Sequence, residues 1–391
     1  MKYIFINIGR VLVRELKMMF ARPLYLFASV GVMLLSTFFF LTLMKGGTAE
    51  NMPVAVVDLD QTSISRRLIH EMQATPSVDI QLITNSYPEA RLAMQQGKIY
   101  GIFVIPEGFY SDLVAFKRPQ MDFYVTNAYT VGGNTAYKQM LTMVNLTSGA
   151  FQREVLRKKG LPDYLIMERI QPVAISAHLI ANPWSNYAIY LVSTIVPGIL
   201  SLVVLMLTIF AIGFELKMQT SRQWLEIAGG NYTVAMIGKL LPYTILYIVL
   251  GIGCNVILFR FMHFPVMGSS WRLVLGILLL VFAMESMAIA LIGALPTLRD
   301  AISIGALYGM LGFSLSGFTY PVMNMLPSFQ ALTWLIPLRH YYKIYVNEAL
   351  MAGPVINTVI PMLCLTAFFM LALIVSPRLH NALQYNNYPL K

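Results

Sequence analysis

Long apolar runs alternate with shorter polar segments along most of this 391-residue chain. A run of about 20 apolar residues is long enough to cross the hydrocarbon core of a bilayer as a helix. The runs of that kind are 23–44, 187–213, 240–260, 271–295, 301–318 and 355–376. The pattern therefore predicts a membrane α-helical protein with six transmembrane helices, in which 184–376 forms a five-helix transmembrane region.

The opening segment, 1–22, has the period of an amphipathic helix. Its apolar stripe is Ile4, Phe5, Ile8, Val11, Leu12, Leu16 and Met19, and the cations away from that stripe are Lys2, Arg10, Arg14, Lys17 and Arg22. A basic helix with one apolar face is typical of a segment lying on an anionic membrane surface. Pro23 then suits the first position of a new helix, so 23–44 is predicted to be the first transmembrane helix.

Residues 45–183 interrupt the apolar runs with a different pattern. We expect strands at 54–58, 79–83, 100–105 and 121–125, and helices at 63–73, 88–96 and 133–159. Strands that alternate with helices indicate a small α/β domain, inserted between the first and second spans. Asp58 and Asp60 follow the first strand, where a turn and a helix cap explain them better than a metal or acid–base site.

Composition agrees with a membrane protein. Hydrophobic residues make up 57% of the chain and charged residues 12%, against about 25% charged in ordinary soluble domains. The net charge is +10, but the sequence has no basic cluster interleaved with aromatic residues, so we expect no nucleic-acid partner. Cys254 and Cys364 lie inside apolar runs and predict neither a disulfide nor a metal site.

The distribution of the cations predicts the orientation. If the N-terminus is cytoplasmic, the inside segments carry Lys2, Arg10, Arg14, Lys17, Arg22, Lys217, Arg222, Lys239, Arg299, Arg378 and Lys391, and the short outside loops carry Arg260, Arg272, Arg339 and Lys343. Cytoplasmic loops of membrane proteins are enriched in Lys and Arg. Both termini, including the tail 377–391, are therefore predicted to be cytoplasmic, and the α/β domain extracytoplasmic.

Two segments between the spans have special patterns. Residues 214–239 are too polar to stay in lipid, and their apolar residues can share one helical face, as in a helix on the membrane surface or a docking helix for a soluble partner. Residues 319–350 are apolar, but Pro321, Pro327 and Pro337 exclude one continuous crossing. We expect short helices there that dip back into the outer leaflet as a re-entrant segment under an aromatic belt.

Glu285 is the one acid within a predicted span, and an acid there is by default a functional hypothesis. The alternative is a hydrogen-bonded carboxyl group beside a polar neighbour such as Ser286.

Several motifs, taken in order, resemble the type-2 exporter permeases of ABC transporters. They are Val54–Asp58 with Asp60-Gln61-Thr62-Ser63, Asn182-Pro183, Val196-Pro197-Gly198, Gly238-Lys239-Leu240-Leu241-Pro242-Tyr243, Leu315–Pro321 and Pro337-Leu338-Arg339. The first of them is similar to the bacterial branch with a large extracytoplasmic domain, a drug or lipid exporter type that works with a periplasmic adaptor and an outer-membrane tunnel. The segment Glu215–Arg222 departs from the family, whose cytoplasmic loop usually begins with a denser charged run.

The resemblance implies a permease subunit of the inner membrane that dimerises with a second permease copy, identical or related, and exports an amphipathic small molecule, drug or lipid. The sequence has no phosphate-binding glycine loop followed by Lys-Ser/Thr, so separate ABC ATPase subunits would use the ATP and Mg, and this chain would bind no cofactor and hold no catalytic residue. The residues implied to couple to the ATPase are Glu215, Arg222, Gln223, Trp224, Leu225, Glu226, Arg14 and Lys17, with Trp224 and Leu225 as apolar anchors in its cleft. Candidates for the translocation path or outer gate are Glu285, Gly317, Pro321 and Pro337.

Two other classes of function stay open. A lipid-modifying membrane enzyme would need His, Ser or carboxylate groups gathered at one leaflet, and the five histidines are scattered without a paired acid. A ligand sensor would need a cytoplasmic effector domain, for which the predicted tail is too short.

Overall fold

The computed structural model describes residues 2–47, 51–74, 78–115, 117, 119–126, 130–158, 160–170, 180–183 and 186–385. The chain forms two compact units, Gly46–His178, and Met1–Lys45 together with Leu179–Lys391. Trp184, where the predicted membrane region begins, Lys159 at the end of the predicted long helix, and the end of the predicted tail with Lys391 lie outside the described residues.

The smaller unit contains a mixed four-stranded sheet. Its strands are β1 Met52–Asp58, β2 Val78–Thr84, β3 Gly101–Ile105 and β4 Asp122–Val125, in the order β2-β1-β3-β4. The central strand β1 is parallel to both neighbours, and β4 is antiparallel to β3. Both faces of a parallel pair need cover, which explains why β1 is apolar almost throughout.

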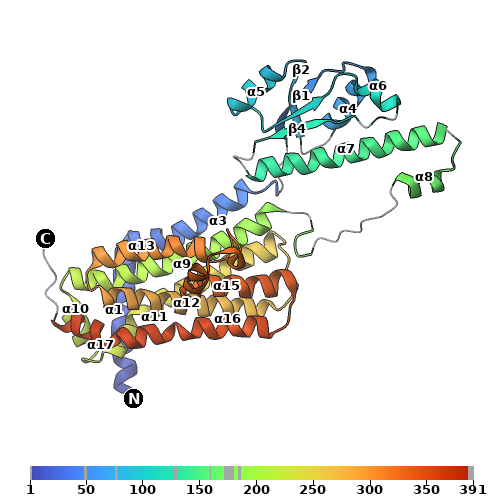
Figure 1. Ribbon diagram of the computed structural model, residues 1–391. Helices are drawn as coiled ribbons and strands as arrows, with labels where there is room; N and C mark the ends of the chain where they lie inside the picture. Colours follow the sequence, from blue (N-terminus) through green and yellow to red (C-terminus); the bar gives the residue numbers. More distant parts are fainter. Residues whose placement is uncertain are drawn as a thin grey trace. The chain divides into compact units, whose positions relative to one another are not determined.

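Helices supply that cover. The helices of this unit are α4 Ser63–Gln73, α5 Tyr87–Gln95, α6 Phe109–Val114, α7 Thr130–Lys158 and α8 Asp163–Ile170, and α4 to α7 pack on the sheet. Val54 and Val56 of β1 face a core that α4, α6 and α7 contribute to, and Ala55 and Val57 face a core shared with α5. Figure 1 shows α7 running along the sheet. The sequence predicts these strands and the longer helices to within a few residues, so the predicted alternation of strands and helices is confirmed.

The turn after β1 is closed by the two acids considered in the sequence. Asp58 accepts hydrogen bonds from the backbone N–H groups of Asp60 and Gln61 and from the Ser65 hydroxyl. Asp60 accepts from Thr62, whose own side chain caps α4 in a capping box with Ser65. The interpretation as turn and cap residues is confirmed.

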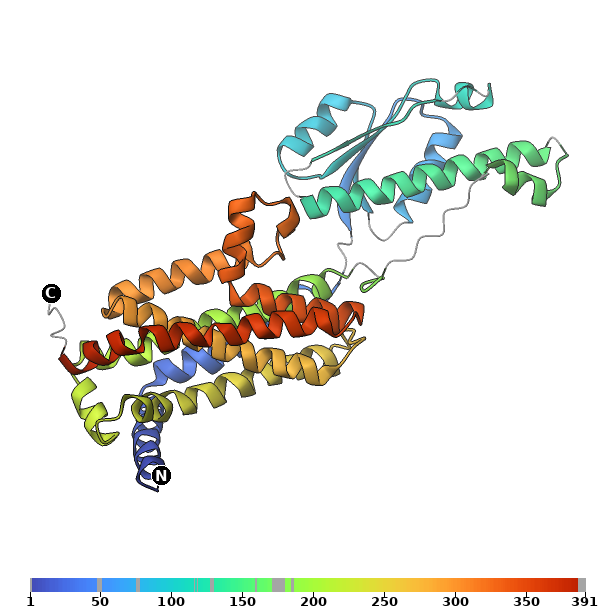
Figure 2. The same cartoon turned by 60° about the horizontal axis from the view of Figure 1, so that its bottom comes forward.

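The larger unit is a bundle of long helices. Its elements up to residue 315 are α1 Lys2–Ala21, α2 Pro23–Leu26, η1 Phe27–Gly31, α3 Val32–Leu43, α9 Tyr187–Lys217, α10 Ser221–Ile227, α11 Tyr232–Val256, η2 Ile257–Phe261, α12 Ser270–Ala294 and α13 Leu298–Leu315. Figures 1 and 2 both show α1 running across the long helices, at the bundle end where α10 lies. The core sits among the long helices, where Val204, Tyr247 and Leu280 are completely buried.

Five helical stretches of the described residues are long and apolar enough to cross a membrane. They are Pro23–Leu43, Tyr187–Lys217, Tyr232–Phe261, Ser270–Ala294 and Ile356–Tyr385. The sixth predicted span corresponds to α13, which has 18 residues and carries Arg299 and Asp300 in its first turn. These charges lower its mean hydropathy, and α13 is not among the five.

Two predicted boundaries are wrong. The predicted polar loop 214–239 is shorter in the structure, because α9 continues to Lys217 and α11 begins at Tyr232 after the Asn231 cap. The last span, α16 Ile356–Ala367 followed by α17 Phe369–Tyr385, continues through Pro377 into the predicted tail. There Leu379 and Leu383 are buried, so packing extends the helix.

The proline-rich segment 319–350 consists of short helices, as predicted. They are η3 Val322–Asn324, α14 Pro327–Leu332, η4 Thr333–Leu335, α15 Pro337–Tyr345 and η5 Val346–Met351. Pro327 and Pro337 each occupy the first position of a helix, where the missing N–H costs nothing.

Candidate functional site

A buried cluster of charges joins α1, α9, α10 and α11. Glu15 of α1 is completely buried, on the same face as Val11 and Met19. Residues at i, i+4 and i+8 share one face of a helix, so the predicted apolar stripe of α1 has a carboxylate in its middle. A fully buried acid requires partners, and α11 supplies them.

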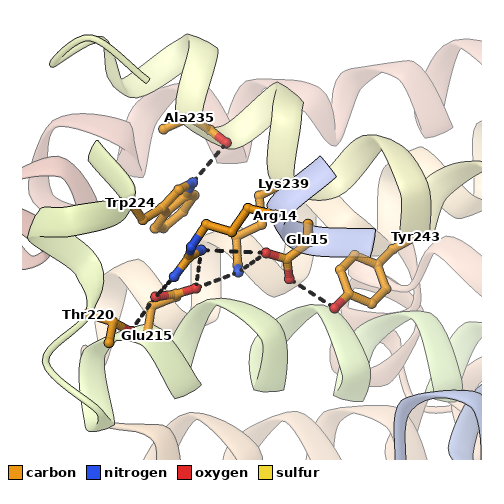
Figure 3. Close-up of polar contacts among 8 residues, drawn as sticks. All are labelled: Arg14, Glu15, Glu215, Thr220, Trp224, Ala235, Lys239 and Tyr243. Carbon is orange, nitrogen blue, oxygen red and sulfur yellow. Dashed lines mark hydrogen bonds and ion pairs between the residues drawn. The ribbon is translucent and has the colours of Figure 1, made fainter. Parts of the chain in front are cut away.

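Lys239 is the central cation of this cluster. Its Nζ lies 2.8 Å from Oε2 of Glu15 and 3.0 Å from Oε1 of Glu215, and all three side chains are buried (Figure 3). One turn later along α11, the Tyr243 hydroxyl donates to Oε1 of Glu15 at 2.9 Å. One face of α11 thus presents an ammonium group and a phenol to α1.

Glu215, in the last turn of α9, accepts from the same cluster. The two terminal nitrogens of Arg14 donate to its two oxygens at 2.8 and 3.0 Å, in a bidentate pair. The Thr220 hydroxyl also donates to Glu215. Burial alone would lower the pKa of Arg14, but the hydrogen bonds and negative charge of Glu215 outweigh burial and hold that pKa above its usual value.

The cluster is balanced, with two carboxylates against Lys239 and Arg14. Because the groups lie in a low-dielectric interior, removal of one charge leaves its partner buried and uncompensated, at a cost of about 3–5 kcal/mol. The cluster therefore holds the crossing helix α1 and the ends of α9 and α11 in one arrangement.

Trp224 of α10 contacts both α11 and the central cation of this cluster. Its indole N–H donates to the Ala235 carbonyl at 3.3 Å, and Lys239 Nζ lies 4.9 Å from its ring centroid (Figure 3). Trp224 is completely buried, and Leu225 is also buried. The chain's own helices therefore cover the two residues that the sequence suggested as apolar anchors in an ATPase cleft.

The other residues expected at the coupling site form two groups, one buried and one exposed. Arg14 and Glu215 come together in the buried cluster. Arg222, Gln223 and Glu226 are exposed on α10, as is Lys17 on α1.

A surface groove runs beside α10. It is lined by Arg222, Leu225, Glu226, Gly230, His380, Gln384 and Tyr385. Arg222 donates to the Gln384 carbonyl of α17 at 2.9 Å, which joins the two sides. Arg222 and Glu226 give this groove a polar rim on the α10 side.

Close packing brings α1 onto α11. A Cβ atom on Gly238 would lie 2.7 Å from Cβ of Val11 and 3.1 Å from the Ile8 carbonyl oxygen. Only glycine allows this approach, which places Lys239, the next residue, within reach of Glu15. The family-like motif Gly238–Tyr243 thus combines the close contact, the ammonium group and the phenol.

The candidate gate residues do not meet at one site. Glu285 of α12 is buried and accepts from the Thr244 hydroxyl of α11 at 2.7 Å. This agrees with the alternative of a hydrogen-bonded carboxyl group beside a polar neighbour, which is Thr244 here, while Ser286 donates to the Phe282 carbonyl. Gly317 and Pro321 belong to the turn after α13, and Pro337 begins α15.

Sequence reasoning missed Glu15, and did not assign Lys239 and Tyr243 to the site. The available signals were the i, i+4 spacing of Lys239 and Tyr243 and the acid in the apolar stripe of α1. Neither signal indicates which residues pair across helices.

Comparisons with known proteins identify relatives that match most of the chain. The family described as ABC-2 family transporter protein matches residues 23–376. The protein named "Probable multidrug ABC transporter permease YbhR" from Escherichia coli (strain K12) is 23% identical over 331 residues, which cover 81% of this chain and 83% of that protein. The protein of the same name from Escherichia coli O157:H7 matches with the same identity and coverage.

Proposed function

The chain belongs to the ABC-2 family of transporter proteins, and from this membership we propose that it is the transmembrane permease subunit of an ATP-driven exporter. Separate ABC ATPase subunits hydrolyse ATP with Mg, and this chain converts their movement into a change in helix packing. The observation that carries the proposal is the buried cluster of Arg14, Glu15, Glu215 and Lys239, because it ties a crossing helix and a short loop helix to two candidate spans.

The ATPase contacts the exposed side of this assembly in our proposal. Gln223 and Glu226 of α10, Arg222 at the groove and Lys17 of α1 are the accessible polar groups. Trp224 acts from inside, by holding α10 against α11 through its bond to the Ala235 carbonyl. A push on α10 or α1 is then passed through the buried ion pairs to α9 and α11, because a closely packed interface moves as a unit.

The proposed placement follows from the charge distribution and the candidate spans. Both termini lie in the cytoplasm, α13 is the sixth span, and Gly46–His178 is the extracytoplasmic domain in the inner membrane permease. At about 1.5 Å per residue, 18 residues span about 27 Å, close to the hydrocarbon thickness of about 30 Å. A second permease copy completes the transporter, and the extracytoplasmic domain meets a periplasmic adaptor that leads to an outer-membrane tunnel.

The outer segment forms the gate in this proposal. The Gly317–Pro321 turn, with Gly317 at a φ of +85°, and the helix that Pro337 opens change their packing when the cytoplasmic side moves. Glu285 lies on the translocation path, where Thr244 holds it in the resting arrangement. The cargo is an amphipathic small molecule, drug or lipid, in agreement with the word multidrug in the name of the Escherichia coli relatives.

A charge substitution on α10 tests the proposal. Gln223→Arg with Glu226→Arg changes two exposed side chains, so thermal stability should stay within about 0.5 kcal/mol of the parent. A change of two side chains to arginine at a docking site should disturb its charge complementarity, weaken association with the cognate ATPase about tenfold and reduce ATP hydrolysis by the reconstituted complex. Arg91→Glu, exposed in the smaller unit, is the control. Undiminished co-purification and ATP turnover would exclude α10 as the coupling element.

A further inference from the structure

The short helices of the outer segment contain cations and no acid. From Ala301 to Asn347 the sequence has no Asp or Glu, and its only Lys or Arg residues are Arg339 and Lys343. Both lie on α15, four residues apart, and therefore on the same face of that helix. This is a local excess of positive charge in an otherwise apolar region.

Arg339 is buried without a counter-ion. Its residue is 6% exposed, one terminal nitrogen donates to the Thr333 hydroxyl, and its Nε has no hydrogen-bond partner. Within the described part of the chain, no carboxylate lies within 4.0 Å of the Arg339 guanidinium group. A buried guanidinium with unused donors is costly unless an anion completes it.

The nearest acid along the chain is already engaged. Glu348 of η5 lies 3.1 Å from Arg272 and accepts from the Ser269 N–H at 3.0 Å and from the Thr358 hydroxyl. A carboxylate held by these groups does not neutralise α15. The charge of Arg339 and Lys343 is therefore available to a ligand.

Trp334 organises the two cations. The guanidinium carbon of Arg339 lies 4.8 Å from its ring centroid and Lys343 Nζ lies 5.3 Å from it. His340 donates from Nε2 to the Trp334 carbonyl at 3.0 Å and fixes the backbone there. Trp334 is 50% exposed and the Lys343 side chain is exposed, so the indole ring and the ammonium group beside Arg339 can be reached from outside.

An apolar groove adjoins the cations. Lys343 lines this groove with mainly apolar residues that include Tyr342, Val346, Met351, Ile360 and Pro361, and the groove volume is about 660 Å³. Ile360 and Pro361 belong to α16, the start of a candidate span, so the groove lies at the edge of a membrane helix. Positive charge beside an apolar groove matches a molecule with an anionic head and a hydrocarbon chain.

We propose that Arg339 and Lys343 bind the phosphate of an anionic phospholipid, with one acyl chain in the adjoining groove. The site depends on the membrane location of the chain and not on the proposed coupling to an ATPase. A lipid bound here joins α15 to α16 and supports the short outer helices from the lipid side.

Fluorescence quenching of Trp334 by brominated lipid tests this site in the full-length protein. The protein is placed in phosphatidylcholine nanodiscs that contain a varied fraction of brominated phosphatidylglycerol or brominated phosphatidylcholine. Subtraction of the Trp334→Phe signal isolates Trp334. Two cations near an anionic head should give phosphatidylglycerol a relative binding constant about tenfold above that of phosphatidylcholine.

Variants distinguish binding at this site from general attraction of anionic lipid to a positively charged protein surface. The double variant Arg339→Gln with Lys343→Gln should bind phosphatidylglycerol and phosphatidylcholine equally well. Lys343→Gln alone changes an exposed position and should lower the relative binding constant of phosphatidylglycerol about threefold. The single variant therefore tests the site even if the double variant fails to fold. Arg260→Gln changes an exposed cation on η2 and should leave the preference unchanged. Equal quenching in the parent protein, or an unchanged preference in Lys343→Gln, would overturn the proposal. Loss of the preference on addition of inorganic phosphate would also overturn it, since it would identify a site for the free anion.

Discussion

Lys239 Nζ lies 2.8 Å from the carboxylate of Glu15, although 224 positions separate the two residues and both are completely buried. Glu215, on a third helix, lies 3.0 Å from the same ammonium group. Each of these charged groups loses its hydration on burial, and only its charged partners compensate for that loss. A buried charge cluster is therefore stabilising only while all of its members are present. The contact is therefore a structural link between α1 and the bundle, and its removal is measurable.

Lys239→Met should destabilise the protein by about 3–5 kcal/mol, because Glu15 and Glu215 lose their shared cation in a buried site. The measurement is the denaturation midpoint in detergent, compared with Lys217→Met, whose side chain is exposed. Adding Glu15→Gln should recover part of the loss, since one of the two uncompensated carboxylates is then removed. Equal stability of the two lysine variants would contradict a buried charge cluster.

Two glycines of α11 should respond to alanine in opposite directions. Gly238→Ala places a methyl group 2.7 Å from Cβ of Val11 and should separate α1 from α11, whereas Gly253 has nothing within 4 Å of its added Cβ. Gly253→Ala should therefore stabilise the helix by about 0.5–1 kcal/mol. Hydrogen exchange of α1 amides reports the first effect, and it should rise in Gly238→Ala alone. If exchange is the same in both variants, the close contact does not hold α1 in place.

Trp224→Ala distinguishes a structural role of the buried indole from a role as a docking anchor for the ATPase. Removal of a completely buried Trp, with its N–H bond to Ala235, should cost about 3–5 kcal/mol of stability even without a partner protein. An exposed docking anchor would instead lose ATPase binding at unchanged stability. Thermal unfolding of the isolated permease distinguishes the two roles, and Gln223→Ala on the exposed face is the matched control.

Cysteine labelling tests the proposed orientation. Gln223→Cys on α10 should be protected from a membrane-impermeant maleimide in intact spheroplasts and labelled after lysis, and Arg91→Cys in the smaller unit should be labelled in both. The background protein has Cys254→Ala and Cys364→Ala, which removes both native cysteines. Labelling of Gln223→Cys in intact spheroplasts would reverse the topology, and the coupling assignment would fail with it.

Much of the architecture follows from local sequence. The strand–helix order of 52–158 was predictable because alternation and turn residues act over a few positions. The prolines at 327 and 337 likewise predict the short outer helices, since proline starts a helix more readily than it continues one. The helix α10 was expected as well, but not the burial of Trp224, because periodicity shows which residues share a face and not what covers that face.

The sequence by itself determined the long apolar helices and the strands and helices of the α/β unit, because hydrophobic transfer and backbone propensity sum along neighbouring residues. The tertiary structure alone decided that Lys239 belongs inside a helix of a candidate span, since a single lysine there is unfavourable until Glu15 and Glu215 surround it. Those carboxylates come from distant helices, and Coulomb attraction in a buried site depends on distance in space, whatever the separation along the chain.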